Sequence, residues 1–346
     1  MEAKPVRIGI VGAGKNTRER HIPGFQAMES VKVVSVANRS RESGQRVADQ
    51  FGIPKVYDHW LELVEADDTD AICIGTWPYL HCPVTLVALE RDKHVMTEAR
   101  MAMNAEEAHR MLNASRERPH LTTQIVPSPF TFEVDETIKS LIADGYLGQV
   151  LAVDMRASDG QFVDRGASIH WRQDRGLSGY NILYMGIWYE ALMRWVGPAT
   201  LVTALTSVIV TQRRDARGEL TIIDVPDHVD ILCRMAIGGQ ARLRFSAVAG
   251  LGPDDEVWIH GSEGTLHLDV PSLTLRGGRR GDEGLKEIPI SPEKRGGWRV
   301  EEEFINAIRG LEKVKLTSFE DGVKYMEFTE AVTRSAQTGQ AIDLPL

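Results

Sequence analysis

A glycine pair near the start of the chain has the composition and spacing of a phosphate-binding turn. The apolar run Ile8–Val11 is followed by Gly12 and Gly14, and then by polar residues that favour a helix: Lys15, Asn16 and Thr17. Glycines suit such a turn because they adopt positive φ at little cost and let a ligand reach the backbone. The helix start then offers unpaired N–H groups to an anion. The pattern is G-x-G-x-x-T, with Thr17 where the dinucleotide fingerprint has glycine or alanine, so a plain turn is the alternative.

The residues about 20 positions further on indicate which dinucleotide would bind. In a dinucleotide fold, an acidic residue after the second strand holds the adenosine ribose hydroxyls of NAD. This chain has Asn38, Arg39, Ser40 and Arg41 there. An uncharged residue removes repulsion for a 2′-phosphate, and the neighbouring side chains supply charge-assisted donors. The sequence therefore favours NADP over NAD, with solvated arginines at a helix start as the alternative interpretation.

The elements that must position these residues alternate between strand and helix. Strands are expected at Val31–Ala37, Val56–Tyr57, Ala71–Thr76 and His94–Glu98, and helices at His21–Met28, Ser43–Phe51, His59–Glu65 and Pro83–Arg91. Asp58 is the expected cap of the third helix. Such alternation predicts right-handed crossovers and a doubly wound parallel sheet. Ligands of these sheets bind at the carboxyl ends of the strands, where Gly12, Asn38, Thr76 and Glu98 fall.

Composition narrows the possible partners. A chain of 346 residues with 42% hydrophobic and 26% charged content is typical of a soluble protein of two domains. Its net charge of −9 argues against nucleic acid or an anionic membrane as the main partner. The three cysteines form no C-x-x-C pair, and His260 and His267 lack an obvious third ligand, so no metal site is expected. Without a signal peptide or an apolar run of about 20 residues, a cytoplasmic location is the expectation.

The second half of the chain predicts a series of strands. They are expected at Val150–Met155, Ala199–Thr211, Val229–Ile237, Ala241–Val248, Glu256–His260, Thr265–Leu268 and Leu273–Arg276. Gly238 and Gly239 form the expected hairpin turn, and Gly277–Gly284 is expected to be a polar surface loop. Helices are expected at Phe132–Ala143, Ile187–Trp195, Val300–Arg309 and Gly322–Gln337. An apolar face on so large a sheet needs cover, and homo-oligomerisation is the simplest way to supply it.

A set of motifs spread over essentially the whole chain completes the sequence pattern. Besides the glycine loop, it comprises His21-Ile22-Pro23, Thr76-x-Pro78-x-x-His81, His94-Val95-x-x-Glu98, Thr317–Gly322 and Ser335–Gly339. In this combination the chain resembles the glucose-fructose oxidoreductase and inositol dehydrogenase family (Gfo/Idh/MocA).

The resemblance implies an N-terminal Rossmann domain, residues 1–125, with a doubly wound parallel sheet. It implies a C-terminal α/β domain, residues 126–346, with a large, mostly antiparallel open sheet and a last helix that can pack back on the first domain. Members use NAD or NADP, act on sugars, polyols and related compounds, and pair their sheets in dimers or tetramers. Thr76, His81 and Glu98 are then expected at the cofactor, and His21 and His81 match positions near the nicotinamide unless they are purely structural.

The chain departs from its relatives at the residues that move protons. The family's usual Glu-Lys-Pro segment is Glu98-Ala99-Arg100 here, so an alanine stands at the lysine position. A second motif, Asp-x-Gly-x-His-x-x-Asp, is matched at Gly186 but has Tyr184, Trp188 and Ala191 in place of its polar residues. A methyl group relays no proton, and an indole N–H only donates.

Several nearby residues are candidates for the missing chemistry. Tyr184 could act as acid or base beside a cation, His170 has a near-neutral reference pKa, and Arg100 could polarise a substrate oxygen. Each has a structural alternative: Tyr184 can simply pack, His170 can cap a turn, and Glu190 on the same helix can pair with Arg194.

Two functions follow from this pattern. The first is an NAD(P)-dependent oxidoreductase of a sugar, polyol or related cyclic hydroxyl compound, with Tyr184 or His170 handling the proton. The second is a nucleotide-binding protein without net redox activity, either a sensor or an enzyme that uses the nucleotide transiently to cleave a glycoside. Family resemblance favours the first, and Ala99 favours the second.

Overall fold

The computed structural model describes residues 4–346, which divide into two compact units. The first unit contains the chain up to Pro127 together with Arg299–Val323. The second contains Ser128–Trp298 and Lys324–Leu346. The chain therefore returns to the first unit after completing most of the second.

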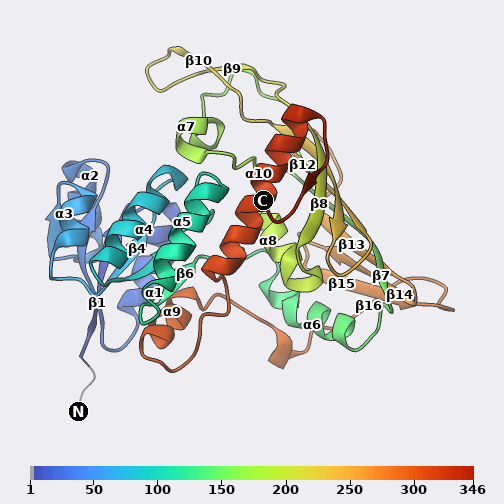
Figure 1. The fold of residues 1–346 in the computed structure, drawn as a ribbon, viewed down its shortest axis with the longest axis horizontal. Coiled ribbons are helices and arrows are strands. Elements are labelled where there is room, and N and C mark those ends of the chain that lie inside the picture. Colours follow the sequence, from blue (N-terminus) through green and yellow to red (C-terminus); the bar gives the residue numbers. More distant parts are fainter. Residues whose placement is uncertain (1–3) are drawn as a thin grey trace. The chain divides into compact units, whose positions relative to one another are not determined.

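The first unit is built on a six-stranded parallel sheet (Figure 1). Its order is β3-β2-β1-β4-β5-β6. The strands are β1 (Val6–Val11), β2 (Val31–Ala37), β3 (Lys55–Tyr57), β4 (Ala71–Ile74), β5 (His94–Thr97) and β6 (Thr123–Ile125). Starting at β1, the chain moves outward to β3 and then returns to the other side with β4, so the carboxyl ends of β1 and β4 flank the point where the order reverses. Ligands of doubly wound sheets bind at that point.

Helices connect these strands: α1 (Ile22–Gln26), α2 (Arg41–Phe51), α3 (Trp60–Glu65), α4 (His81–Glu90) and α5 (Ala105–Arg116). A later helix, α9 (Val300–Ile308), also belongs to this unit and contacts α1. Strands of this kind are almost wholly apolar because helices cover both faces. Buried residues of the strands and helices form one cluster that includes Val11, Leu63, Ile72, Val84, Leu89 and Val95.

The predicted order of strand, tight turn and helix is confirmed, with two local differences. The helix expected at His21 begins earlier, with a π-helical turn at Thr17–His21 that leads directly into α1. Asp58 was expected to cap the third helix, and this is wrong. The cap of α3 is His59, whose Nδ1 accepts a hydrogen bond from the Leu61 N–H, while Asp58 pairs with Arg41.

The second unit contains a nine-stranded, mostly antiparallel sheet. Its order is β16-β15-β14-β13-β7-β12-β11-β8-β17, and the β12–β7 pair is parallel. The strands are β7 (Val150–Ser158), β8 (Ala199–Ser207), β11 (His228–Met235), β12 (Gln240–Ser246), β13 (Glu256–Gly261), β14 (Gly264–Asp269), β15 (Thr274–Arg279), β16 (Lys286–Glu287) and β17 (Ile342–Asp343). Gly238 and Gly239 both have positive φ and join β11 to β12, as predicted.

Helices cover one face of this sheet. They are α6 (Phe132–Ala143), α8 (Met185–Val196) and the part of α10 (Phe319–Thr338) that lies in this unit, whereas the short α7 (Arg175–Ser178) contacts the turn Trp171–Gln173. The Tyr189 ring on α8 stacks on Phe328 of α10 at 3.6 Å between centroids, and Ser335 of α10 accepts a hydrogen bond from the Ala204 N–H of β8. Strand residues therefore alternate between this apolar side and the opposite face.

Two predicted segments of the second half are wrong. Gly277–Gly284 is not wholly a loop, because β15 continues through Arg279 and pairs with β14. A Cβ on Gly277 would lie 2.5 Å from Cδ1 of Ile288 and 2.7 Å from the Tyr146 hydroxyl, so a larger residue would displace these side chains. The single strand expected at Ala199–Thr211 ends at Ser207, and a separate hairpin of β9 (Gln212–Arg214) and β10 (Leu220–Ile222) follows.

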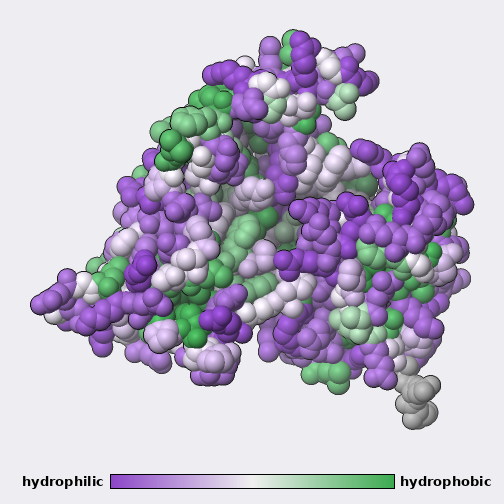
Figure 2. Space-filling model, turned by 180° about the vertical axis from the view of Figure 1, so that it is seen from behind, coloured by the Kyte–Doolittle hydropathy of each residue, from purple (hydrophilic) through white to green (hydrophobic). Residues whose placement is uncertain are grey.

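Surface character agrees with the composition. In Figure 2, hydrophilic residues cover most of the visible face and hydrophobic residues form separate patches. Among the residues that the structure describes, no helix has the length and apolar character needed to cross a membrane.

Candidate functional site

The glycine loop is shaped by close contacts that only glycine permits. Gly12 has φ of 81° and its N–H donates to the Ala37 carbonyl at 2.8 Å. A Cβ on Gly12 would lie 2.5 Å from Cγ2 of Thr76, and a Cβ on Gly75 would lie 2.0 Å from Oγ1 of Thr17. Thr17 thus occupies the place of the third glycine and is tolerated because Gly75 leaves it room. The loop between β1 and the π-helical turn stays tight and open to a ligand.

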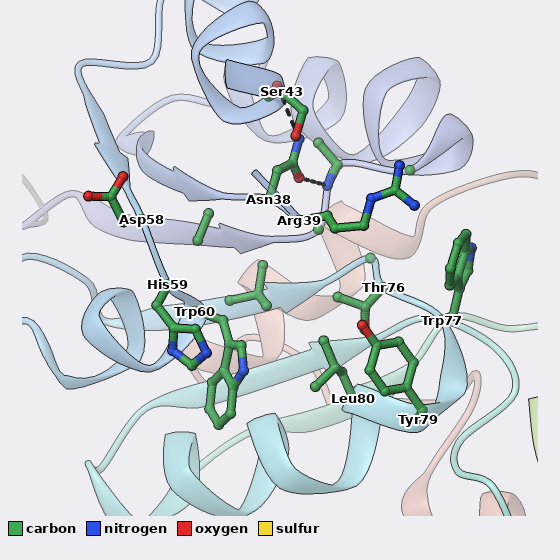
Figure 3. Close-up of a pocket in the computed structure, with 16 residues that line it drawn as sticks. Asn38, Arg39, Ser43, Asp58, His59, Trp60, Thr76, Trp77, Tyr79 and Leu80 are labelled. Carbon is green, nitrogen blue, oxygen red and sulfur yellow. Dashed lines mark hydrogen bonds between the residues drawn. The ribbon is translucent and has the colours of Figure 1, made fainter. Parts of the chain in front are cut away.

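Asn38 braces this loop through both ends of its side-chain amide. Its Oδ1 accepts a hydrogen bond from the Ala13 N–H at 2.7 Å, and its Nδ2 donates to the Ser43 carbonyl at 3.2 Å (Figure 3). A carboxylate could make the first bond but not the second, because it has no donor. The position is therefore built for asparagine, and its amide links the glycine loop to the first turn of α2.

A cavity of about 520 Å³ opens beside these residues, wholly within the first unit. Of the residues predicted for the cofactor, it brings together Gly12, Gly14, Asn38, Arg39 and Thr76. Sequence reasoning missed other lining residues that follow the ends of β3 and β4 or begin α2: Ser43, Asp58, His59, Trp60, Trp77, Tyr79 and Leu80. Apart from Ser43, these residues could have been recognised in the sequence because they come just after the ends of two strands, where ligands of such sheets bind.

Cationic and aromatic groups meet at one part of this cavity. In Figure 3 the Arg39 side chain extends toward the side on which Trp77 lies, and its guanidinium carbon is 6.0 Å from the indole centroid. Ser40 caps α2 and accepts a hydrogen bond from the Ser43 N–H. The first turn of α2 therefore directs a positive dipole end toward the neighbourhood of Arg39, which favours an anionic group there.

The other residues predicted for the cofactor do not line this cavity. They are Lys15, Asn16, Thr17, Ser40, His81 and Glu98. Lys15 is exposed, and His81 is fully buried with Nε2 3.0 Å from the Thr76 carbonyl and Nδ1 2.8 Å from that of Arg100. Burial lowers the pKa of His81 despite the two carbonyl contacts, and the ring supports the backbone of Thr76 and Arg100.

Asn16 and Glu98, both partly buried, meet in a cluster with the fully buried His21. Asn16 Nδ2 donates to Glu98 Oε1 at 2.5 Å, and His21 Nε2 lies 3.0 Å from the same oxygen. The other ring nitrogen, Nδ1, hydrogen-bonds Glu301 of α9. Burial alone would lower the pKa of His21, but hydrogen bonds and charge from the two carboxylates raise it to about 9. Glu301 has no sequence signal that would connect it with His21, because the two are 280 positions apart.

Arg100 does not line the cavity beside the glycine loop. It is 1% exposed, and it is also absent from the lining of a second cavity, in the second unit, that contains Tyr184. Its carbonyl is held by His81, so its backbone supports the segment after β5.

The second unit has its own cavity, of about 310 Å³. Tyr184, which precedes α8 and is 40% exposed, lines it together with Trp188 of the same helix. The Trp188 ring lies 4.7 Å from Phe130, and Phe245 supplies a further aromatic wall. Aromatic walls offer apolar faces to the C–H groups of a ring-shaped ligand.

Polar groups converge on the same cavity. Its remaining polar lining residues are Ser158, Asp159, Ser246 and Asp255. Asp255 accepts a hydrogen bond from the Ser158 N–H at 2.7 Å. Burial raises the pKa of both carboxyl groups, and the charge of Asp159 further raises that of Asp255. Carboxylates and hydroxyls of this kind hydrogen-bond the hydroxyl groups of a ligand.

Two other predicted residues have structural partners. His170 caps the turn Trp171–Gln173 by accepting a hydrogen bond from the Arg172 N–H, and it does not line the cavity that contains Tyr184. Burial and the Arg172 charge lower the pKa of His170. Glu190 pairs with Arg194 at 2.6 Å, which is the structural alternative expected from their spacing.

A glycine turn on the first strand of a β3-β2-β1-β4-β5-β6 sheet defines a Rossmann domain that binds a dinucleotide. A family model described as oxidoreductase family, NAD-binding Rossmann fold, matches residues 6–124, and the Gfo/Idh/MocA C-terminal domain matches residues 136–267. The chain belongs to the Gfo/Idh/MocA family of NAD(P)-binding oxidoreductases.

Individual relatives span nearly the whole chain. The 1,5-anhydro-D-fructose reductase of Ensifer adhaerens is 27% identical, with 98% of each chain covered. The levoglucosan dehydrogenase of Pseudarthrobacter phenanthrenivorans is 22% identical over the same shares. Among solved structures, a levoglucosan dehydrogenase in complex with NADH and L-sorbose superposes with a TM-score of 0.84 at 21% identity, covering 98% of this chain and 99% of that one. At this identity the superposition establishes the fold.

Proposed function

We propose that the protein is an NADP-preferring oxidoreductase that moves a hydride between nicotinamide and a CH–OH carbon of a sugar, polyol or related cyclic compound. The observation that carries the proposal is the cavity beside the glycine loop, which combines a cradle with no room for side chains and a cationic end at Arg39.

The residues of the first unit fit a dinucleotide. Gly12 and Gly14 line the cavity and, without side chains, let a pyrophosphate approach the backbone of the loop. Arg39, with Ser40 and Ser43 at the start of α2, provides donors for a 2′-phosphate, while Asn38 removes the charge that would repel it. NAD is the alternative cofactor, and relatives such as levoglucosan dehydrogenase bind NADH.

The cavity of the second unit supports a sugar-like substrate. Its aromatic walls at Phe130, Trp188 and Phe245 can pack against a sugar ring, and Asp159 and Asp255 can accept hydrogen bonds from its hydroxyls. Relatives named for levoglucosan and 1,5-anhydro-D-fructose act on cyclic sugar derivatives.

Proton transfer is assigned first to Tyr184. Its hydroxyl can both accept and donate a proton, and the Arg172 guanidinium lies 5.1 Å from the centre of its ring. Bound nicotinamide supplies the hydride chemistry, and Tyr184 holds or releases the hydroxyl proton of the substrate. His170 and Arg100 remain the other candidates, with weaker support because neither lines the cavity.

A second function is favoured by Ala99 and Trp188. Both stand where the family usually has proton-transfer residues, so a protein that binds the nucleotide without net redox turnover is the alternative. It would be a sensor, or an enzyme that uses the nucleotide transiently to cleave a glycoside.

The exposed face of the nine-stranded sheet supports a homodimer or homotetramer. Leu205 and Leu232 project from it with 77% and 59% exposure, among ion pairs such as Arg244–Asp230. Light scattering should give a mass of two or four chains, and a monomer at working concentration would contradict this part of the proposal.

Steady-state assays test the proposed function. Purified protein is incubated with NADP or NAD and a panel of sugars and polyols, and the nicotinamide absorbance is followed. Turnover with NADP and at least one cyclic substrate is expected. Tight nucleotide binding without turnover on any substrate would overturn the proposal in favour of the alternative.

A further inference from the structure

His21 joins three segments of the first unit that are distant in sequence. It ends the π-helical turn after the glycine loop, and its ring is fully buried. One side of the ring meets Glu98, which follows β5, and the other meets Glu301 on α9. A Cβ on Gly24 would lie 2.9 Å from Cγ of Glu301, so α1 and α9 approach closely where this carboxylate enters.

We propose that His21, in its doubly protonated form and clamped by Glu98 and Glu301, is a positioning residue that, through Asn16, fixes the glycine loop for the nicotinamide nucleotide. This inference rests on the proposed function, because it assumes that the loop carrying Asn16 binds the cofactor.

The two carboxylates that face the two ring nitrogens favour both ring protons, while Asn16 Nδ2 also lies 3.2 Å from Nε2. Nε2 of His21 and Nδ2 of Asn16 both donate to Glu98 Oε1, while Nδ1 of His21 donates to Glu301. A neutral imidazole has a single N–H. After deprotonation, one ring nitrogen would present a lone pair to a buried carboxylate oxygen, and that contact would become repulsive.

Other titratable groups lie close to the two carboxylates of the cluster. Cys73 of β4 lies near both carboxylates, and burial together with their charge raises its thiol pKa well above the usual value. His81 of α4 is close enough to influence Glu98, but burial lowers its pKa. The cluster therefore contains two carboxylates and the His21 ring, with Cys73 and His81 beside them and the buried Arg100 two positions after Glu98. Glu98 stays ionised, since its interactions with His21 and Asn16 outweigh burial and lower its pKa.

Loss of the His21 proton should therefore release the loop. Asn16 follows Gly14 by two positions, so movement of its amide changes the conformation of the glycine turn. Nucleotide affinity should be constant at neutral pH and should fall once the pH passes about 9, the value to which the cluster raises the His21 pKa. With one proton involved, the dissociation constant rises about tenfold per pH unit above that point.

Calorimetric titration of the full-length protein with NADP and NAD, between about pH 6 and pH 10, tests this inference. The variant Glu301→Gln keeps a hydrogen-bond acceptor but removes one negative charge, so the pH midpoint of the dissociation constant should move down by about one unit or more. Glu303→Gln is the matched control on the same helix. Glu303 is also buried, but it accepts hydrogen bonds from the Lys315 and Leu316 N–H groups rather than from His21.

The outcomes separate the two proposals. A midpoint that moves in Glu301→Gln but not in Glu303→Gln supports the positioning role. Equal midpoints in the wild type and Glu301→Gln would overturn it, even if affinity falls at every pH, because that pattern marks a purely structural contact. Absence of NADP and NAD binding at every pH would instead overturn the proposed function. NMR titration of the His21 ring in the nucleotide-free protein reports its pKa directly, and a value near 6.5 would also contradict the inference.

Discussion

Raising the pH from 7 to about 9 should destabilise the first unit through His21 alone. The folded pKa is about 9, against a reference value of 6.5. A raised folded pKa means that the stabilisation is fully present below pH 6.5 and is lost as the pH rises through 9. Each pH unit over which the folded protein keeps a proton that the unfolded chain has released changes the unfolding free energy by about 1.4 kcal/mol. Allowing for partial protonation at the upper end, about 2 kcal/mol should be lost.

Thermal unfolding of the wild type and His21→Gln at both pH values measures this loss. Every other titrating group is present in both proteins, so the difference between their Tm changes reports the contribution of His21. For a unit of this size, about 2 kcal/mol corresponds to roughly 4–8 °C of additional loss in the wild-type Tm. Equal Tm changes in the wild type and the variant would refute the reasoning, because they would show that the His21 proton is not taken up on folding.

Four further substitutions test the residues assigned to the cofactor, to the glycine loop and to proton transfer. Arg39→Ala should raise the Kd for NADP about 10- to 100-fold, because it removes a charge-assisted contact, and it should leave the Kd for NAD nearly unchanged in calorimetric titrations. Equal changes in both Kd values would show that Arg39 does not bind the 2′-phosphate. Asn38→Asp removes the N–H donor to the Ser43 carbonyl, so it should lower the unfolding free energy by about 1–3 kcal/mol in denaturant titrations. An unchanged unfolding midpoint would show that the Asn38 amide does not stabilise the link between the glycine loop and α2. Tyr184→Phe should lower kcat by about 100-fold or more with KM little changed, whereas His170→Ala should have a smaller effect; full activity in both would show that proton transfer lies elsewhere.

Local patterns were sufficient for much of the fold. The β-branched run Val31–Ala37 and the amphipathic segment Phe132–Ala143 form a strand and a helix with the bounds that were predicted. Both signals are contained within one element. The alternation of such elements in the first third then fixed the parallel sheet, since few topologies satisfy the crossover rules.

Features that depend on contacts between residues distant in the sequence could not be predicted from local patterns. Gly277 was interpreted as a loop residue because glycine usually marks a turn, but here it lies in β15 close to Tyr146. At the site, Gly12 and Arg39 could be predicted from the spacing of a known turn. Glu301 could not, because only the return of α9 to the first unit brings it to His21.

Isotope transfer tests the central claim, hydride exchange between a cyclic hydroxyl compound and a nicotinamide nucleotide, most directly. A cyclic polyol that gives turnover is labelled with deuterium at the reacting CH–OH carbon, incubated with protein and NADP, and the nucleotide and sugar products are analysed by mass spectrometry. One deuterium is expected in the reduced nucleotide for each molecule of oxidised product. Deuterium that stays with the sugar product, with no net reduced nucleotide, would contradict net oxidoreductase activity and identify the transient-redox alternative.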